Sequence, residues 1–129
     1  MSAAPSSGLA GRALVQVALP TRDLARAKAF YADVLGLPLL LETNGMAFFS
    51  LANARLMVGE REAETLGPGV IYIDAPDLPD LAADLEARGV AFVGPAETLQ
   101  RTADGDLQLR FFRDPDENMV GLMGVVKTA

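Results

Sequence analysis

One pattern occurs twice in the chain, and this internal repeat constrains the fold more than any other feature. The first copy, LVQVALPTRDL at residues 14–24, is an alternating apolar run followed by a proline and an Asp-Leu pair. The second copy, GVIYIDAPDL at residues 69–78, has the same order, and the two Asp-Leu pairs stand 54 residues apart. A period of this size indicates two copies of one supersecondary unit that pack against each other.

Each copy predicts an amphipathic helix directly after its Asp-Leu pair. In the first copy, Asp23 is the expected N-cap, apolar residues recur at helical spacing over residues 24–35, and Gly36 is the expected end. In the second copy the helix follows Asp77 and ends at Gly89. Each helix has one apolar face, which must lie on a sheet.

Short apolar segments separated by turn residues follow each helix and predict strands. They lie at residues 37–43, 46–52 and 54–60 in the first copy, and at residues 90–96, 107–113 and 119–125 in the second. The predicted order is therefore β-α-β-β-β, twice, and the expected fold class is α+β with the helices on the outer face of a mostly antiparallel sheet.

The length of the chain suits one domain with a core of its own. We expect a flexible tail at residues 1–12 and a single domain at residues 13–129, with modules at 13–60 and 69–126. The apolar runs fall far short of the ~20 residues that cross a bilayer, and the start lacks the pattern of a secretory signal. A cytoplasmic location is the expectation.

The composition removes several kinds of chemistry. The chain has no cysteine and no histidine, which excludes disulfides, thiolate nucleophiles and the commonest general base and transition-metal ligand. Acidic side chains outnumber basic ones 17 to 11, giving a formal charge of −6. Such a chain repels phosphate backbones and anionic membranes on average, so neither nucleic acid nor a membrane is an expected partner.

Three stretches together resemble a known family. They are VQVALPTRDLARAKAFYADVLGL near the start, FFRDPDENMVGL near the end, and the weaker GVIYIDAPDLPDLAADLEARGV between them. The chain resembles the vicinal oxygen chelate superfamily, which includes glyoxalase I, extradiol dioxygenases, fosfomycin-modifying enzymes and bleomycin resistance proteins. The resemblance implies paired βαβββ modules that form a cupped sheet, often completed by a second subunit, so we expect a homodimer. Glu117 departs from the family turn, DPDGN, which has glycine there.

Enzymes of this superfamily typically hold one divalent metal ion in the cup, with side chains from the first and fourth strand of each module. Counting from the Asp-Leu pairs and the DPD-x-N turn assigns three of these positions to Gln16, Val70 and Gly121, and strand alternation assigns the fourth to Met57. A divalent ion needs several anionic or imidazole donors, and one neutral amide cannot replace them. We therefore expect no metal and no other cofactor.

Residues in phase with these four positions are expected to line the cup, because side chains alternate along a strand. They are Ala18, Arg55, Tyr72, Met119 and Met123, together with Phe111, where extradiol dioxygenases often place a catalytic tyrosine. A lining of this kind suits an apolar or planar organic ligand.

Each of these residues also has a purely structural interpretation. The methionines fit a protein core equally well, and Tyr72 can bury its ring while its hydroxyl meets water. Arg55 is the most informative candidate, because a cation in an apolar cup is costly unless an anion meets it. Its alternative is an exposed strand position paired with Glu60 or Glu62.

Three functions are compatible with this cup. The preferred one is a metal-free protein of the bleomycin resistance type that sequesters an apolar or aromatic drug or metabolite in a cleft. The second is a metal-independent lyase, isomerase or dioxygenase-like enzyme, in which Arg55 polarises an oxyanion and a carboxylate such as Glu42 acts as base. The third is a non-catalytic interaction module whose cup is filled by its own side chains.

Overall fold

The computed structural model describes residues 9–64 and 67–128, so most of the predicted tail, residues 1–8, lies outside the described residues. The strands are β1 Gln16–Pro20, β2 Leu39–Thr43, β3 Met46–Ser50, β4 Arg55–Gly59, β5 Val70–Asp74, β6 Phe92–Thr102, β7 Gly105–Arg113 and β8 Met119–Val126. The helical segments are α1 Leu24–Lys28, the π-helix η1 Ala29–Val34, the 3₁₀ helix η2 Arg61–Glu64 and α2 Leu78–Ala87.

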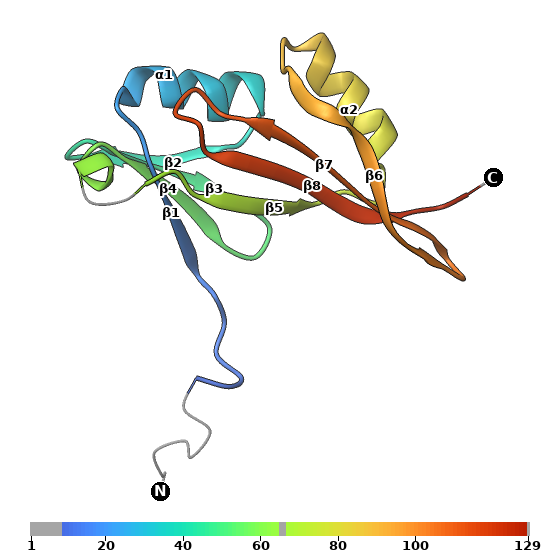
Figure 1. Ribbon diagram of the computed structural model, residues 1–129. Coiled ribbons are helices and arrows are strands. Elements are labelled where there is room, and N and C mark those ends of the chain that lie inside the picture. Colours follow the sequence, from blue (N-terminus) through green and yellow to red (C-terminus); the bar gives the residue numbers. More distant parts are fainter. Residues whose placement is uncertain (1–8, 65–66, 129) are drawn as a thin grey trace, which may run out of the picture.

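The strands form two four-stranded sheets of identical topology, in the orders β1-β4-β3-β2 and β5-β8-β7-β6. In each sheet the first strand pairs in parallel with the fourth, and the remaining pairs are antiparallel. The predicted repeat of a β-α-β-β-β unit is therefore confirmed. Figure 1 shows α1 and α2 on the same side of the strands, which is the predicted placement of the helices.

The first helix begins where the sequence predicts but continues differently. The Asp23 carboxylate accepts a hydrogen bond from the Arg26 amide at 3.1 Å, and the Glu60 carboxylate accepts one from the Leu24 amide at 3.1 Å. These bonds satisfy amides that lack partners within the first turn. After α1 the chain widens into η1, which was not predicted, and Gly36 then ends the helix with a φ of +78°.

The two modules share one packed interior on the helix-facing sides of the sheets. Buried side chains of the first module include Tyr31, Phe49, Leu56 and Val58, and those of the second include Leu78, Leu85, Phe112, Val120 and Leu122. Phe30, Leu35 and Ile71 pack against both groups. Neither α1 nor α2 covers the opposite side of the sheets.

Two turns have backbone conformations that the sequence allows one to anticipate. Asn44 and Gly45 connect β2 and β3 with φ values of +51° and +78°, the signs required by a two-residue type I′ hairpin. Glu117 has a φ of +70°, so glutamate occupies a left-handed position that favours glycine.

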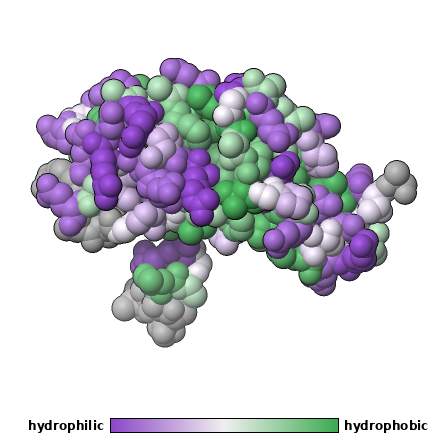
Figure 2. Space-filling view, turned by 45° about the horizontal axis from the view of Figure 1, so that its top comes forward, coloured by the Kyte–Doolittle hydropathy of each residue, from purple (hydrophilic) through white to green (hydrophobic). Residues whose placement is uncertain are grey.

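On the face seen in Figure 2, hydrophilic side chains cover the side that carries α1, and hydrophobic ones gather towards the middle of the molecule.

Candidate functional site

The sides of the two sheets that face away from the helices are called the open faces here. Val17 and Leu56 pack into the core of the first module, and Ile71, Phe112 and Val120 pack into that of the second. Their neighbours along each strand point to the other side. By this alternation the open faces carry Gln16, Ala18, Arg55 and Met57 on the first sheet and Val70, Tyr72, Phe111, Met119, Gly121 and Met123 on the second.

On the first sheet, Arg55 is held by two neighbours. Gln16 lies opposite Arg55 in the β1–β4 register, and its Oε1 accepts a hydrogen bond from Arg55 Nε at 2.6 Å. The guanidinium carbon lies 4.7 Å from the centroid of the Phe48 ring, a cation–π distance. Among the described residues Arg55 makes no ion pair with Glu60 or Glu62, the two alternative partners. Met57 continues this surface and is only 8% exposed.

On the second sheet, two aromatic rings lie over a glycine. The ring centroids of Tyr72 and Phe111 are 5.8 Å apart at an interplanar angle of 64°. A Cβ at Gly121 would lie 2.8 Å from Phe111 Cε1 and 2.9 Å from Tyr72 Cδ1, so only glycine leaves room for both rings in this position. We call these three residues the aromatic shelf.

The aromatic shelf is open to solvent. Tyr72 is 56% exposed and its neighbour Val70 is 52% exposed, while Met119 and Met123 are half-buried beside them. An exposed arrangement of this kind leaves ring surface available to another molecule. The structure thus brings the ten predicted residues together in two groups, one on each sheet.

Sequence analysis missed two side chains of the first open face. Phe48 lies in a wholly apolar run, MAFFS, whose alternation gives no phase, and only the pairing of Phe48 with Met57 places it. Glu62 lies in η2, outside the strand counting, yet its carboxylate packs against Gly59, which is in phase with Met57. Among the described residues Glu62 Oε1 is buried without a hydrogen-bond partner. Gly59 is the sequence signal for this contact, because a larger side chain at position 59 would collide with the Glu62 carboxylate.

The acidic turn between β7 and β8 has a structural role at its first carboxylate. Asp114 Oδ1 accepts hydrogen bonds from the amides of Asp116 at 2.8 Å and Asn118 at 2.9 Å. Its Oδ2 accepts from the Tyr31 hydroxyl at 2.8 Å and from Asn118 Nδ2 at 2.8 Å. Burial, followed by the negative charge of Asp114, raises the pKa of Tyr31 above its ordinary value, so the phenol stays protonated and donates.

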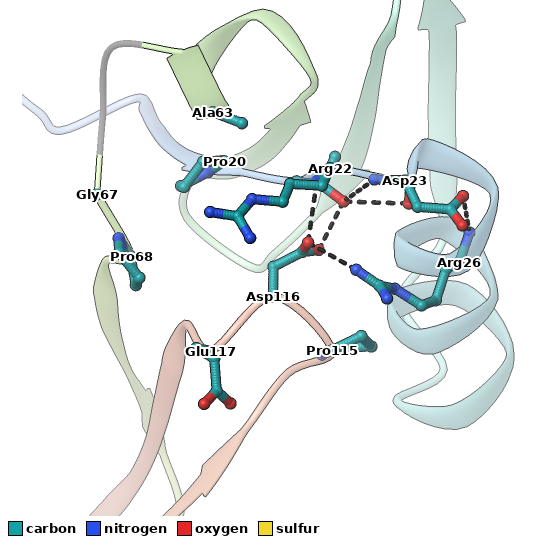
Figure 3. Close-up of a pocket in the computed structure, with 11 residues that line it drawn as sticks. Pro20, Arg22, Asp23, Arg26, Ala63, Gly67, Pro68, Pro115, Asp116 and Glu117 are labelled. Atoms are coloured by element: carbon teal, nitrogen blue, oxygen red, sulfur yellow. Dashed lines mark hydrogen bonds and ion pairs between the residues drawn. The ribbon is translucent and has the colours of Figure 1, made fainter.

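The rest of the same turn binds the first module. Asp116 accepts from Thr21 Oγ1 at 2.6 Å, from the Arg22 amide at 2.9 Å and from Arg26 Nη2 at 2.8 Å (Figure 3). Asn118 Nδ2 also donates to the Pro20 carbonyl at 3.0 Å. We call Asp114, Asp116 and Asn118 the clasp, because they tie the β7–β8 hairpin to the end of β1 and to the first helix.

A pocket of about 470 Å³ lies beside the clasp. Figure 3 shows it between the turn carrying Asp116 and Glu117, the start of α1 and the segment at Gly67 and Pro68. None of the ten predicted residues lines it. Its central carboxylate, Asp116, accepts hydrogen bonds from three donors of the first module, so this group serves the fold.

The described part of the chain contains neither a cluster of metal-ligating side chains nor a membrane-spanning helix. Within residues 9–64 and 67–128, no group of three or more acidic, histidine or cysteine side chains is arranged to hold a metal ion. The amide oxygen of Gln16, the only side-chain oxygen among the four counted positions, is engaged by Arg55. No helix within those residues is long and apolar enough to cross a membrane.

Comparison with known proteins gives a clear relationship at the level of the family. The sequence profile of the Glyoxalase/Bleomycin resistance protein/Dioxygenase superfamily matches residues 13–122. A search of curated proteins gives no match.

Solved structures share this fold. Lactoylglutathione lyase from Agrobacterium tumefaciens superimposes with a TM-score of 0.71 at 24% identity, over 89% of this chain and 95% of that one. TnmS3, an antibiotic-binding protein from Streptomyces sp. CB03234, gives 0.70 at 26% identity, over 90% and 98% of the two chains. A glyoxalase/bleomycin resistance protein/dioxygenase from Nocardioides gives 0.70 at 20% identity, over 90% and 85%. The chain belongs to the Glyoxalase/Bleomycin resistance protein/Dioxygenase superfamily.

Proposed function

We propose that the protein binds a small planar organic molecule on its open faces, without a metal ion, and does not turn it over. The observation that carries this proposal is the aromatic shelf, where the exposed ring of Tyr72 and the half-buried ring of Phe111 lie over Gly121. Stacking on such rings contributes roughly 0.5–1.5 kcal/mol per aromatic pair beyond the burial of apolar area, which adds ~25 cal/mol per Å². The antibiotic-binding activity named for TnmS3 is compatible with a binding role on this fold.

The enzymatic alternative loses Glu42, the carboxylate suggested as its base. Glu42 Oε1 accepts a hydrogen bond from Lys28 Nζ on α1 at 2.6 Å, so this carboxylate lies on the helix side of the first sheet. A general base must reach the proton that it removes, and Glu42 points away from the open face. The interaction-module alternative requires a cup filled by its own side chains, whereas Tyr72 and Val70 are more than half exposed.

The metal-free part of the proposal rests on the chemistry of the four counted positions. Met57, Val70 and Gly121 carry no oxygen or nitrogen donor in their side chains, and the oxygen of Gln16 already accepts from Arg55. A hard or borderline cation would lose its hydration shell here without adequate replacement.

We further propose that two copies of the chain associate and that their open faces form the walls of the binding cleft. A single copy leaves apolar side chains of both open faces in contact with water, among them Val70 and Tyr72. The edge strand β2 adds three consecutive exposed leucines, Leu39 to Leu41. A two-fold partner can cover surfaces of this kind. Multi-angle light scattering at micromolar concentration tests this association, and a mass near 13.6 kDa would contradict it.

The binding proposal is tested by titration calorimetry with the neutral aromatic probe 2-naphthamide. We expect saturable binding that weakens at least about tenfold in Tyr72→Ala, because one stacking surface is removed. Leu99→Ala is the matched control, since Leu99 is similarly exposed, at 49%, but lies on β6. Absence of binding by both 2-naphthamide and its acid 2-naphthoate would overturn the proposal. Equal affinity of wild type and Tyr72→Ala for 2-naphthamide would show that the aromatic shelf is not the binding surface.

A further inference from the structure

The first open face carries a cation that is fixed before any ligand arrives. The Arg55 guanidinium lies over the Phe48 ring, and its Nε donates to Gln16 Oε1. The backbone of Arg55 is also fixed, because its amide donates to the Val15 carbonyl at 2.9 Å. Arginine side chains at a surface usually lose considerable rotamer freedom when they bind, and here that loss has already occurred.

The bonds that hold Arg55 leave its binding edge free. The hydrogen bond to Gln16 uses Nε, whereas Nη1 and Nη2 make no hydrogen bond or ion pair with any residue in the described ranges 9–64 and 67–128. These two nitrogens form the fork that matches the two oxygens of a carboxylate. In a chain of formal charge −6, an arginine without an acidic partner is poised for an external anion.

Gln16 orients the Arg55 guanidinium at a position where related enzymes hold a metal ion. The resemblance described above assigns position 16 to a metal ligand, and here the same side chain orients a guanidinium. The first open face therefore keeps a positive centre beside the buried side chains of Phe48 and Met57, but the centre is an organic cation. A guanidinium binds oxyanions through directed hydrogen bonds and offers no vacant coordination site.

We propose that Arg55 receives a carboxylate or similar oxyanion of the ligand, so that the ligand class is aromatic acids and their oxyanion analogues. This inference rests on the proposed binding function and names the chemistry of its ligand. Arg55 binds the charged end, Phe48 and Gln16 position the guanidinium, and the aromatic shelf of the proposed function, with the exposed Tyr72, receives the ring system. A neutral isostere leaves the fork unpaired and loses the charge-assisted bonds.

The test compares 2-naphthoate with 2-naphthamide, which share a ring system and differ in charge. Wild type is expected to bind the acid at least about tenfold more tightly, which corresponds to roughly 1.4 kcal/mol. Arg55→Met should reduce this preference to within about threefold while leaving 2-naphthamide affinity almost unchanged. Arg55→Lys should restore only part of it, because lysine keeps the charge but lacks the fork.

Two further variants separate a specific role from a general charge effect. Arg101→Met removes one positive charge from a side chain on β6 that is 80% exposed, and it should retain the full preference for the acid. Gln16→Ala keeps the charge of Arg55 but removes its orienting bond, so an intermediate preference is expected. Equal affinity for both probes in wild type, or an undiminished preference in Arg55→Met, would overturn the inference.

A second measurement does not depend on aromatic binding at all. The ¹⁵N–¹H signal of Arg55 Nε is followed by NMR during titration with acetate, which carries the oxyanion without the ring. A saturable shift in the wild type that weakens in Gln16→Ala is expected, and an unmoved signal would contradict the role of Arg55. If neither naphthalene probe binds while acetate still shifts the signal, the proposed function fails but the oxyanion site stands.

Discussion

Replacing Asp114 by asparagine tests the claim that the acidic turn is a structural clasp. The carboxylate accepts four hydrogen bonds, two at each oxygen, from the amides of Asp116 and Asn118 and from the side chains of Tyr31 and Asn118. An asparagine has one acceptor oxygen, so whichever way it is oriented, its NH₂ group meets donors at the other position. Asp114→Asn therefore loses about two of the four bonds.

The magnitude follows from the kind of bond that is lost. Hydrogen bonds to a charged group contribute roughly 1.5–3 kcal/mol each when buried, so the variant should lose about 4 kcal/mol of unfolding free energy. With an unfolding entropy near ~2.1 cal/mol/K per residue, this lowers Tm by about 15 °C. Tyr31→Phe removes a single donor and should lose about 2 kcal/mol.

Urea denaturation followed by circular dichroism measures both losses. Asp104→Asn is the control, because Asp104 is exposed at the tip of the β6–β7 hairpin, and it should change stability by less than ~0.5 kcal/mol. If Asp114→Asn were within about 1 kcal/mol of wild type, the clasp would not hold the modules together as described.

Three further predictions concern the turn, the buried phenol and the aromatic shelf. Glu117→Gly should raise stability by about 1 kcal/mol, because φ is +70°, whereas Glu117→Ala should give no such gain in the same denaturation assay. The pKa of Tyr31 is raised above 10.0, so its stabilising contribution is complete below pH 10 and is lost as pH rises further. Alkaline denaturation should therefore be shallower in Tyr31→Phe, by up to ~1.4 kcal/mol per pH unit, and an identical slope would count against the buried phenol. Gly121→Ala should weaken 2-naphthamide binding at least about fivefold, because the added methyl group forces the rings of Tyr72 and Phe111 apart. Little stability should be lost, because the exposed Tyr72 ring can move into solvent. Unchanged affinity would contradict this prediction.

The repeat and the landmarks around it were sufficient to predict the order of helices and strands along the chain, but not the order of strands within each sheet. Proline, Asp-Leu and glycine signals recur in both copies, and local signals of this kind fix where a helix begins and ends. Asp23 and Gly36 accordingly lie where the sequence placed them. The π-helix η1 was not predictable, because no local pattern in the sequence marks it; Phe30 within it packs against the cores of both modules.

The orientation of the site residues was predictable, but their contacts were not. Strand alternation alone places Arg55 and Tyr72 on the open faces, since their neighbours are buried. The bond from Arg55 to Gln16 depends on the β1–β4 register, and Phe48 lies in a run without alternation. The role of Asp114 depends on Tyr31, which is 83 residues away in sequence, so the turn motif alone could not distinguish a site from a clasp.

The central claim is that the open faces bind an aromatic anion through Arg55 and the aromatic shelf, and not through a metal ion. The most direct measurement is the Tm of the metal-stripped protein after addition of Ni²⁺, Mn²⁺ or Zn²⁺, compared with its Tm at saturating 2-naphthoate. The account predicts no change with any of the metal ions and a rise of several degrees with the acid. A rise of several degrees with one of the metal ions, accompanied by one bound ion per chain, would contradict it.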